Sequence, residues 1–184
     1  MYFFEESNRY RKGYFENMNS LLIVGAGSFS CEVDELARHL GYTSIVFLDD
    51  NPSGAYSSPV IGTTADIEKL RSQYDTAIVA LGNNINRMKY HQMLKIYGYR
   101  IPVLIHPTAY ISPDASIADG CIVRAKVIVS RHVKVGEATI LNAGAQIDHH
   151  VEVGYGCHIL MGAVLRNMVR VPPLARVESL SLVQ

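Results

Sequence analysis

The chain has no surplus of charge of either sign, because 17 lysine and arginine residues balance 17 aspartate and glutamate residues among its 184 positions. Proteins that hold nucleic acid by its phosphates usually have a basic surplus, so the composition gives no indication of nucleic-acid binding. No apolar run approaches the roughly 18 residues of a membrane span, and the first residues lack the apolar core of a signal peptide. We therefore expect a cytoplasmic protein without a membrane span.

Cysteine is also scarce, with only Cys31, Cys121 and Cys157 in the chain. An odd number of cysteines cannot form a complete set of disulfides. We expect all three to be small core residues in a reducing compartment.

What the chain does have is a strict six-residue repeat in its second half. Every sixth residue is aliphatic, and the residue two positions before each is small or β-branched. The aliphatic positions are Ile111, Ile117, Val123, Val129, Val135, Leu141, Ile147, Val153, Ile159, Leu165, Val171, Val177 and Val183. A period of six is typical of a parallel β-helix, expected here to be left-handed, in which three short strands make one coil of about 18 residues. Residues one coil apart should stack, and the flat outer faces should pack around a threefold axis as a homotrimer.

The first half has the periodicities of alternating strands and helices. Strands are expected at residues 20–24, 44–48, 76–81 and 100–105, with helices at 29–40, 65–73 and 85–97. This order predicts a small parallel α/β sheet of Rossmann type, which binds ligands at the carboxyl ends of its strands. We expect this domain to cover residues 18–105 and the β-helix residues 106–184. Residues 1–17 fit neither half and are predicted to be a disordered extension, with an arm docked on a neighbouring subunit as the alternative.

A glycine turn follows the first expected strand. Gly25 and Gly27 would let the backbone approach a phosphate, and the next helix would present free N–H groups to an anion. Asp49 lies where a carboxylate would bind a ribose hydroxyl, but Ser30 replaces the third glycine of the dinucleotide-binding motif. From these residues alone, a nucleotide site and a turn that only joins strand to helix both remain open.

A group of histidines lies on the β-helix. His132 and His150 are one coil apart and should stack, with Asp114 one coil below His132. His149 ends a hexapeptide at a corner, where a neutral imidazole could take a proton from a hydroxyl or an amine. A solvated surface histidine is the alternative.

The two halves together resemble one family, the bacterial sugar acetyltransferases typified by sialic acid O-acetyltransferase and the N-acetyltransferase of UDP-4-amino-sugars. The resemblance covers about nine tenths of the chain. The matching segments are Gly25-Ala26-Gly27, Phe47-Leu48-Asp49-Asp50, Val60-Ile61-Gly62, Leu81-Gly82-Asn83-Asn84 with Arg87, Leu104-Ile105-His106-Pro107, Ile111-Ser112-Pro113, Asn142-x-Gly144-Ala145, Asp148-His149 and His158.

The resemblance implies a role for individual residues. His149 matches the general base, His158 and Gly162 match positions near the acetyl-CoA thioester and its oxyanion, and Asn142 matches a residue that faces the acceptor. His150 stands where the family has a carboxylate beside the base. The expected pocket for the nucleotide or sugar part of the acceptor consists of Gly25, Gly27, Ser28, Asp49, Asp50 and Asn83.

The sequence thus predicts an acetyltransferase that uses acetyl-CoA as co-substrate and no metal. Its acceptor would be an amine or hydroxyl of a nucleotide-linked sugar in bacterial surface-glycan synthesis. The alternative is a catalytically decayed homologue that binds a sugar nucleotide and oligomerises. A β-helix carbonic anhydrase with three histidines on zinc is a third hypothesis.

Overall fold

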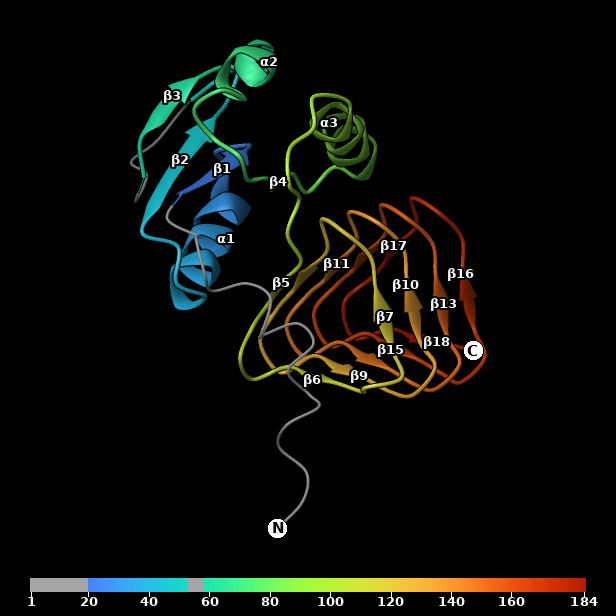
Figure 1. Ribbon diagram of the computed structural model, residues 1–184. Coiled ribbons are helices and arrows are strands. Elements are labelled where there is room, and N and C mark those ends of the chain that lie inside the picture. The colour runs from blue at the N-terminus through green and yellow to red at the C-terminus, as the bar shows by residue number, and fades with distance from the viewer. Residues whose placement is uncertain (1–19, 53–57) are drawn as a thin grey trace.

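The computed structural model describes residues 20–52 and 58–184, and the expected extension at residues 1–17 lies outside this part of the chain. It contains an α/β domain and, beside it, a prism of stacked coils (Figure 1). No helix among the described residues is long and apolar enough to cross a membrane.

The α/β domain is built on a four-stranded parallel sheet. Its strands are β1 (Ser20–Val24), β2 (Ser44–Leu48), β3 (Val60–Gly62) and β4 (Ala77–Val79), in the spatial order β3-β2-β1-β4. The chain order reverses between β1 and β4, and a sheet of this kind binds ligands at that point, beyond the carboxyl ends of the strands. The glycine turn after β1 and the segment after β4 therefore meet at the edge where a ligand is expected.

Helices cover both faces of this sheet because its central strands are apolar throughout. Helix α1 (Ser28–His39) packs Val33, Leu36 and Ala37 against one face. The other face is covered by α2 (Ile67–Leu70), which follows the 3-10 turn η2 (Thr64–Asp66), and by α3 (Asn84–Ile96). Asn83 caps α3, since its side-chain oxygen accepts from the N–H of Asn86 at 2.9 Å.

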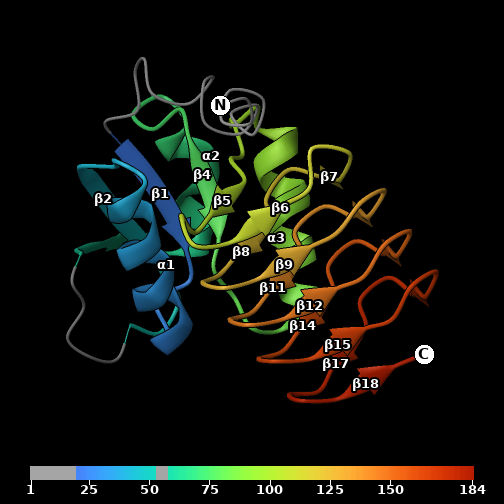
Figure 2. The same cartoon turned by 90° about the horizontal axis from the view of Figure 1, so that it is seen from below.

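The prism is a parallel β-helix with two-residue strands. These are β5 (Leu104–Ile105), β6 (Tyr110–Ile111), β7 (Ser116–Ile117), β8 (Ile122–Val123), β9 (Ile128–Val129), β10 (Lys134–Val135), β11 (Ile140–Leu141), β12 (Gln146–Ile147), β13 (Glu152–Val153), β14 (His158–Ile159), β15 (Val164–Leu165), β16 (Arg170–Val171), β17 (Arg176–Val177) and β18 (Leu182–Val183). Every third strand pairs in parallel, so residues one coil apart are in register, as Ile140 is with His158. The stacked coils are seen from below in Figure 2.

The second residue of each strand points into the prism, as the repeat predicts. Its interior holds the aliphatic column together with the small residues two positions earlier, and Val123, Leu141 and Ile159 have no exposed surface. Cys121 and Cys157 belong to this core, where burial raises the pKa of both thiols, whereas Cys31 on α1 is only half-buried and is not the core residue that was expected.

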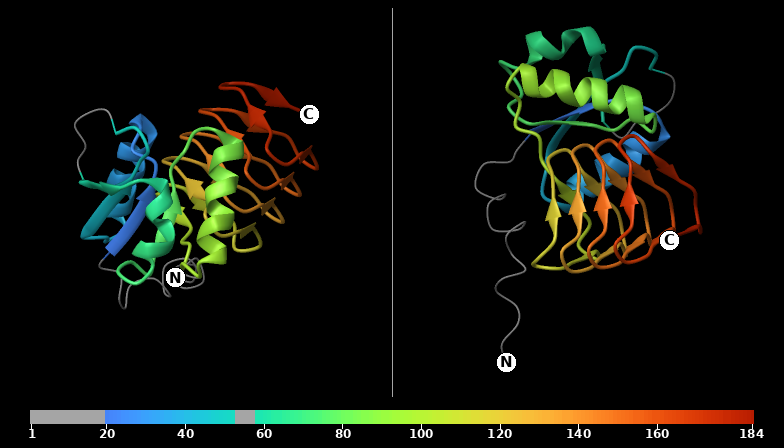
Figure 3. Two further views of the ribbon diagram at one scale, coloured as in Figure 1. Left: turned by 90° about the horizontal axis from the view of Figure 1, so that it is seen from above. Right: turned by 90° about the vertical axis from the view of Figure 1, so that its right-hand side faces the viewer.

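The three outer faces differ in the first residue of each strand. The docking face consists of β5, β8, β11, β14 and β17. Its residues Ile122 and Ile140 pack in the same apolar cluster as α1, so the α/β domain covers this face. The charged face (β7-β10-β13-β16) carries Ser116, Lys134, Glu152 and Arg170. The apolar face (β6-β9-β12-β15-β18) carries Tyr110, Ile128, Gln146, Val164 and Leu182. Figure 3 shows α3 running along the coils beside the docking face.

Two sequence-based expectations for the α/β domain are wrong. Of the strand expected at residues 100–105, Arg100 pairs with Thr76 beside β4 through a single parallel bridge, whereas β5 pairs with β8 of the β-helix. The fourth strand of that sheet is instead β3, at residues for which no strand was expected. The helix expected at 65–73 is also shorter, because η2 takes up its start and α2 ends at Leu70.

Candidate functional site

The turn after β1 requires a glycine at Gly25. Its φ is +106°, and a Cβ there would lie 2.7 Å from Leu81 Cδ2 and 3.1 Å from the Ala80 carbonyl oxygen. The backbones after β1 and β4 thus approach each other closely, as expected at a ligand-binding edge. Gly27 precedes α1 and provides no side-chain cap; in the first turn, the Ser30 N–H donates to the Gly27 carbonyl at 3.0 Å.

Asp49 lies against this turn, as the sequence suggested. One carboxylate oxygen accepts from Ala26 N at 2.6 Å and the other from Asn51 N at 2.8 Å. The negative charge is therefore held at the glycine turn by main-chain N–H groups. Asp49 shapes this turn as well as lining it.

The side chains of Asp50 and Asn83 accept hydrogen bonds from neighbouring segments at the same edge of the sheet. Asp50 accepts from Thr64 through both the main-chain N–H and the hydroxyl, at 2.8 and 2.9 Å. Asn83 is the cap of α3. Both residues lie where the sequence placed them, but each side chain already holds a neighbouring segment.

Asn84 and Arg87, near the start of α3, join the α/β domain to one corner of the β-helix. We call these two residues the corner clamp. Arg87 is completely buried. Its guanidinium donates to the carbonyls of Ala138 (2.7 Å), Gly156 (2.8 Å) and Cys157 (3.0 Å). It also donates to the Leu81 carbonyl and the Asn84 side chain, both at 2.8 Å.

The corner clamp reaches three successive coils. Asn84 Nδ2 donates to the carbonyls of Leu174 (2.9 Å) and Ala175 (3.0 Å), one coil beyond the Arg87 partners Gly156 and Cys157. Among the described residues no carboxylate pairs with Arg87, and burial lowers its pKa to about 10. The buried guanidinium is satisfied by carbonyl dipoles instead of an opposite charge.

His158 lies on the docking face beneath the start of α1. The imidazole is 6% exposed, and its ring centroid is 6.3 Å from that of Phe29. Burial lowers its pKa to about 4, and the positive charges of Arg87 and Arg176 act in the same direction. The main chain of Gly82 and the negative charge of Glu178 act on the pKa in the opposite direction. His158 is therefore neutral at physiological pH.

Asn142 lies beside His158 at the corner between the docking face and the apolar face. Its Oδ1 accepts from Arg124 Nη1 at 2.7 Å and from Ala143 N at 2.8 Å, and its Nδ2 is 3.5 Å from His158 Nε2. Gly162 lies at the same corner one coil above Gly144, and its N–H donates to the Ala143 carbonyl at 3.0 Å. The structure thus places Asn142 next to His158, and Gly162 at the same corner as Asn142 in the next coil.

His149 lies at the next corner, between the apolar and charged faces. Its Nδ1 is 3.0 Å from His150 Nδ1, so one of the two nitrogens carries the shared proton. The Asp148 carboxylate accepts from the His149 main-chain N–H at 2.7 Å. The expected stack of His132 on His150 is present at 4.7 Å between ring centroids, whereas Asp114 pairs with Arg131 at 3.0 Å.

The two groups of site residues are not brought together within one chain. Asn142 precedes β12 and His149 follows it, so the whole width of the apolar face separates them. Sequence reasoning also missed Glu32 and Arg124, which form an ion pair of 2.8 Å between α1 and the β-helix. Position 124 is one coil before Asn142, and that spacing was the available signal.

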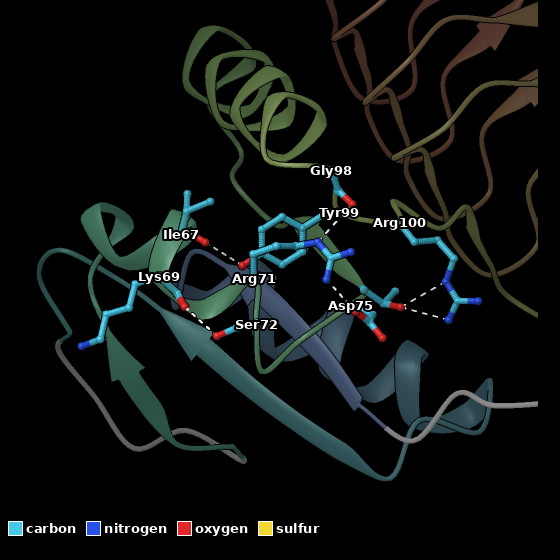
Figure 4. A network of polar contacts seen from close by, with 9 residues as sticks. Ile67, Lys69, Arg71, Ser72, Asp75, Gly98, Tyr99 and Arg100 are labelled. Atoms are coloured by element: carbon cyan, nitrogen blue, oxygen red, sulfur yellow. Dashed lines mark hydrogen bonds and ion pairs between the residues drawn. The ribbon is translucent and has the colours of Figure 1, made fainter.

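A cavity of about 430 Å³ lies at the opposite end of the sheet, near the amino ends of β1 and β4 (Figure 4). Arg71 there donates to Asp75 at 2.6 Å and to the Gly98 carbonyl at 3.1 Å, and Arg100 donates to Thr76 at 2.9 Å. Tyr99 donates to the Ile67 carbonyl at 2.6 Å. These contacts join α2 to the segment entering the β-helix, and none of the predicted site residues lines this cavity.

Comparison with known proteins gives the same assignment as the fold. Residues 20–94 match the family model described as the PglD N-terminal domain. The acetyltransferase domain of PglB from Neisseria gonorrhoeae FA1090 is 32% identical, with 90% of this chain and 91% of that chain covered and a TM-score of 0.81. The chain belongs to the bacterial sugar acetyltransferases of the PglD type.

Further solved structures of PglD-type acetyltransferases agree. The same PglB domain in complex with acetyl coenzyme A is 31% identical, with 91% of this chain and 93% of that chain covered and a TM-score of 0.74. A histidine variant of perosamine N-acetyltransferase from Caulobacter crescentus, in complex with CoA and GDP-perosamine, is 25% identical. The match covers 91% of this chain and 90% of that chain, with a TM-score of 0.82. The predicted fold and acetyltransferase class are confirmed, and a decayed homologue is not favoured.

The histidines at this corner are the residues on which the zinc hypothesis depends. The part of the chain that the structure describes contains no group of three or more His, Cys, Asp or Glu side chains placed to hold a metal ion. The stacked pair His132 and His150 thus lacks a third ligand among these residues.

Proposed function

We propose that this PglD-type enzyme transfers the acetyl group of acetyl-CoA to an amine or hydroxyl of a nucleotide-linked sugar, in bacterial surface-glycan synthesis in the cytoplasm. The observation that carries the proposal is the match over nine tenths of the chain to a PglB acetyltransferase domain that was also solved with acetyl coenzyme A. The related perosamine enzyme was solved with GDP-perosamine, which supports a nucleotide sugar as the acceptor.

The acceptor would be bound at the carboxyl edge of the α/β sheet. Gly25, Gly27 and Ser28 form the turn at the N-terminus of α1, where uncapped N–H groups favour an anion such as a diphosphate. Asp49, Asp50 and Asn83 surround this turn, with Asp49 placed for a hydroxyl of the nucleotide or sugar. In this proposal the Rossmann-like domain binds substrate and not a redox cofactor.

The proposed reaction is a direct acyl transfer with His149 as general base. His149 takes the proton of the acceptor amine or hydroxyl as its nitrogen or oxygen attacks the thioester carbonyl. The tetrahedral intermediate then collapses, its carbon–sulfur bond breaks, and the CoA thiolate leaves with the proton that His149 took. The oxyanion is stabilised at the corner that contains His158, Gly162 and Asn142, where the NH₂ group of Asn142 is a hydrogen-bond donor.

We further propose that the protein is a homotrimer assembled through the apolar face. The docking face is covered by the α/β domain and the charged face carries solvated ion pairs, such as Lys134 with Glu152 at 3.5 Å. On the apolar face, Tyr110, Ile128 and Leu182 are 59%, 42% and 58% exposed and lie in one column. An exposed apolar column on a rigid flat surface is suited to a second copy of the chain.

Assembly would also complete the site. His149 and Asn142 lie at opposite corners of the apolar face, so one chain cannot place both beside the same acetyl group. Packing around a threefold axis brings a corner of one prism next to the other corner of its neighbour. We propose that His149 of one protomer acts with Asn142 and His158 of the next.

Free-thiol release from acetyl-CoA tests the proposed function directly. The purified chain is incubated with acetyl-CoA and a panel of nucleotide-linked sugars that carry amines or hydroxyls, and thermal shifts are recorded for each ligand alone. We expect at least one acceptor to give stoichiometric thiol release and to raise the melting temperature. A chain that binds nucleotide sugars but releases no thiol with any of them would contradict the enzymatic proposal.

A further inference from the structure

The group around Asn142 contains enough fixed donors to determine where protons lie. Oδ1 of Asn142 is contacted by Arg124 Nη1 at 2.7 Å and by the N–H of Ala143 at 2.8 Å. Both are obligatory donors, so the oxygen of the amide must face them. The NH₂ group of Asn142 therefore faces His158.

The orientation of the amide fixes the tautomer of His158. Asn142 Nδ2 can only donate, and it lies 3.5 Å from His158 Nε2, so Nε2 must be the unprotonated nitrogen. The ring is neutral because it is buried beside Arg87 and Arg176. Its single proton is then on Nδ1, which is buried.

Arg124 is in turn held by the α/β domain. The Glu32 carboxylate, on the first turns of α1, pairs with Arg124 Nη1 at 2.8 Å. The side chain of Arg124 is 23% exposed and that of Glu32 46%, so the pair borders solvent between the two domains. A chain of contacts thus runs from Glu32 through Arg124 and Asn142 to His158.

We infer that Glu32 and Arg124 are positioning residues that orient the Asn142 amide and thereby hold His158 as a hydrogen-bond acceptor at Nε2. This assignment rests on the proposed function and refines it: the donor offered to the reacting group in this corner is Asn142 Nδ2, and His158 accepts. Because Glu32 belongs to α1 beside the proposed acceptor turn, the contact chain joins the acceptor domain to the acetyl-transfer corner.

Nitrogen NMR of histidine-labelled protein tests the tautomer independently of activity. In the wild type we expect a pyridine-type Nε2 and a pyrrole-type Nδ1 for His158, assigned by comparison with His158→Gln. Asn142→Asp replaces the amide donor by a carboxylate, and we expect the His158 proton to move to Nε2. A wild-type ring protonated at Nε2, or an unchanged tautomer in Asn142→Asp, would overturn the inference.

The positioning role is tested by Arg124→Met and Glu32→Gln, with Arg170→Met as the matched control. Arg170 also loses one ion pair, to Glu152 at 3.3 Å, but its side chain is 82% exposed and lies on the charged face, on β16. We expect Arg124→Met to lower kcat about tenfold with the KM for acetyl-CoA unchanged. A misplaced Asn142 amide would slow the acetyl-transfer step without weakening the binding of acetyl-CoA. Arg124→Lys should recover part of the loss, and Glu32→Gln should lose less than Arg124→Met.

The possible failures are distinguishable. Wild-type kcat and an unchanged His158 spectrum in Arg124→Met would contradict the positioning role. If no acceptor supports acetyl transfer, the proposed function fails, while the nitrogen spectra of the wild type and Asn142→Asp still decide whether the Asn142 amide sets the tautomer.

Discussion

At the scale of single residues, His149 is the side chain on which the proposed chemistry depends most. Its Nδ1 shares a hydrogen bond with His150 Nδ1, so His150 orients the imidazole ring of His149 but supplies no negative charge. His150 has a φ of 60°, a conformation that histidine tolerates better than most residues. The base is therefore positioned but receives no electrostatic help from His150.

His149→Ala should remove nearly all acetyl transfer, by a factor of about 10² to 10⁴, while nucleotide-sugar binding is retained. His150→Ala should cost much less, and His150→Glu should raise the rate, because a carboxylate favours the imidazolium formed during proton transfer. Thiol release measured for the three variants beside the wild type checks these outcomes. Full activity in His149→Ala would show that the base is another residue.

His158 makes the stability of the protein sensitive to acid. Its pKa is lowered to about 4 by burial, with Arg87 and Arg176 acting in the same direction, whereas an unfolded histidine titrates near 6.5. The unfolded state therefore binds a proton first, and stability is lost as the pH falls below 6.5. Linkage gives a loss of about 2 kcal/mol at pH 5 from this residue. Burial also lowers the pKa of His91, which acts in the same direction.

Urea unfolding at pH 7 and pH 5 measures this effect. His158→Gln should be less stable than the wild type at pH 7 but should lose less stability on acidification. Equal losses in the two proteins would rule out His158 as a source of the acid sensitivity.

At the scale of secondary-structure elements, the corner clamp decides how α3 is held on the β-helix. Arg87→Ala should lower the free energy of unfolding by about 3–5 kcal/mol, because it leaves several buried carbonyl oxygens without a hydrogen-bond donor. Arg87→Lys should recover only part of this loss, since an ammonium cannot reproduce the planar fork. Asn84→Ala removes its two hydrogen bonds to the carbonyls of Leu174 and Ala175 and the one that it accepts from Arg87, and should cost about 1–2 kcal/mol. Urea titrations of the three variants check the order, and an Arg87→Ala protein as stable as Asn84→Ala would contradict it.

The six-residue repeat made nearly all of the β-helix predictable, because each in-phase aliphatic residue has only the prism interior in which to bury. The same register extends to Ile105 and Val103, and this signal could have assigned β5 to the β-helix and not to the α/β sheet. The local pattern could not show this, since residues 100–105 are apolar enough for either sheet. A strand as short as β3 has too few residues to show a period.

The candidate site was predictable in part. The glycine turn with Asp49 followed from the motif, whereas Asn142 and His158 were assigned only through the resemblance to the family. The contacts of Arg87 with Ala138 and of Arg124 with Glu32 could not be predicted, because they join domains whose relative placement no local pattern encodes.

At the scale of the whole molecule, the proposed shared site means that acetyl transfer requires the trimer. Ile128→Lys places a charge in the apolar face and should give monomers that have lost acetyl transfer, since burying an unpaired charge is costly. Ser116→Asp adds a charge on the charged face and should leave the trimer and its activity intact. Sedimentation and thiol release measured on the same samples check both, and an active monomer would contradict the shared site.

Mixing two inactive variants gives a sharper test of the shared site. When His149→Ala and Asn142→Ala are unfolded and refolded together, some corners pair an intact His149 with an intact Asn142 from a neighbour. Activity should reappear in the mixture but not in either variant refolded alone. Its absence, with mixed trimers demonstrated, would place the whole site in one protomer.

The corner clamp also limits how this chain can change length during evolution. An insertion of six residues between Ala138 and Gly156 would turn all later coils by one face, removing His158 from α1 and Gly156 from Arg87. An insertion of about 18 would restore the face, and main-chain carbonyls of the inserted coil would take the places of those of Gly156 and Cys157 beside Arg87. The stretch from Ala138 to Ala175 should therefore accept a whole coil more readily than an insertion or deletion of any other length, even at corners that point into solvent.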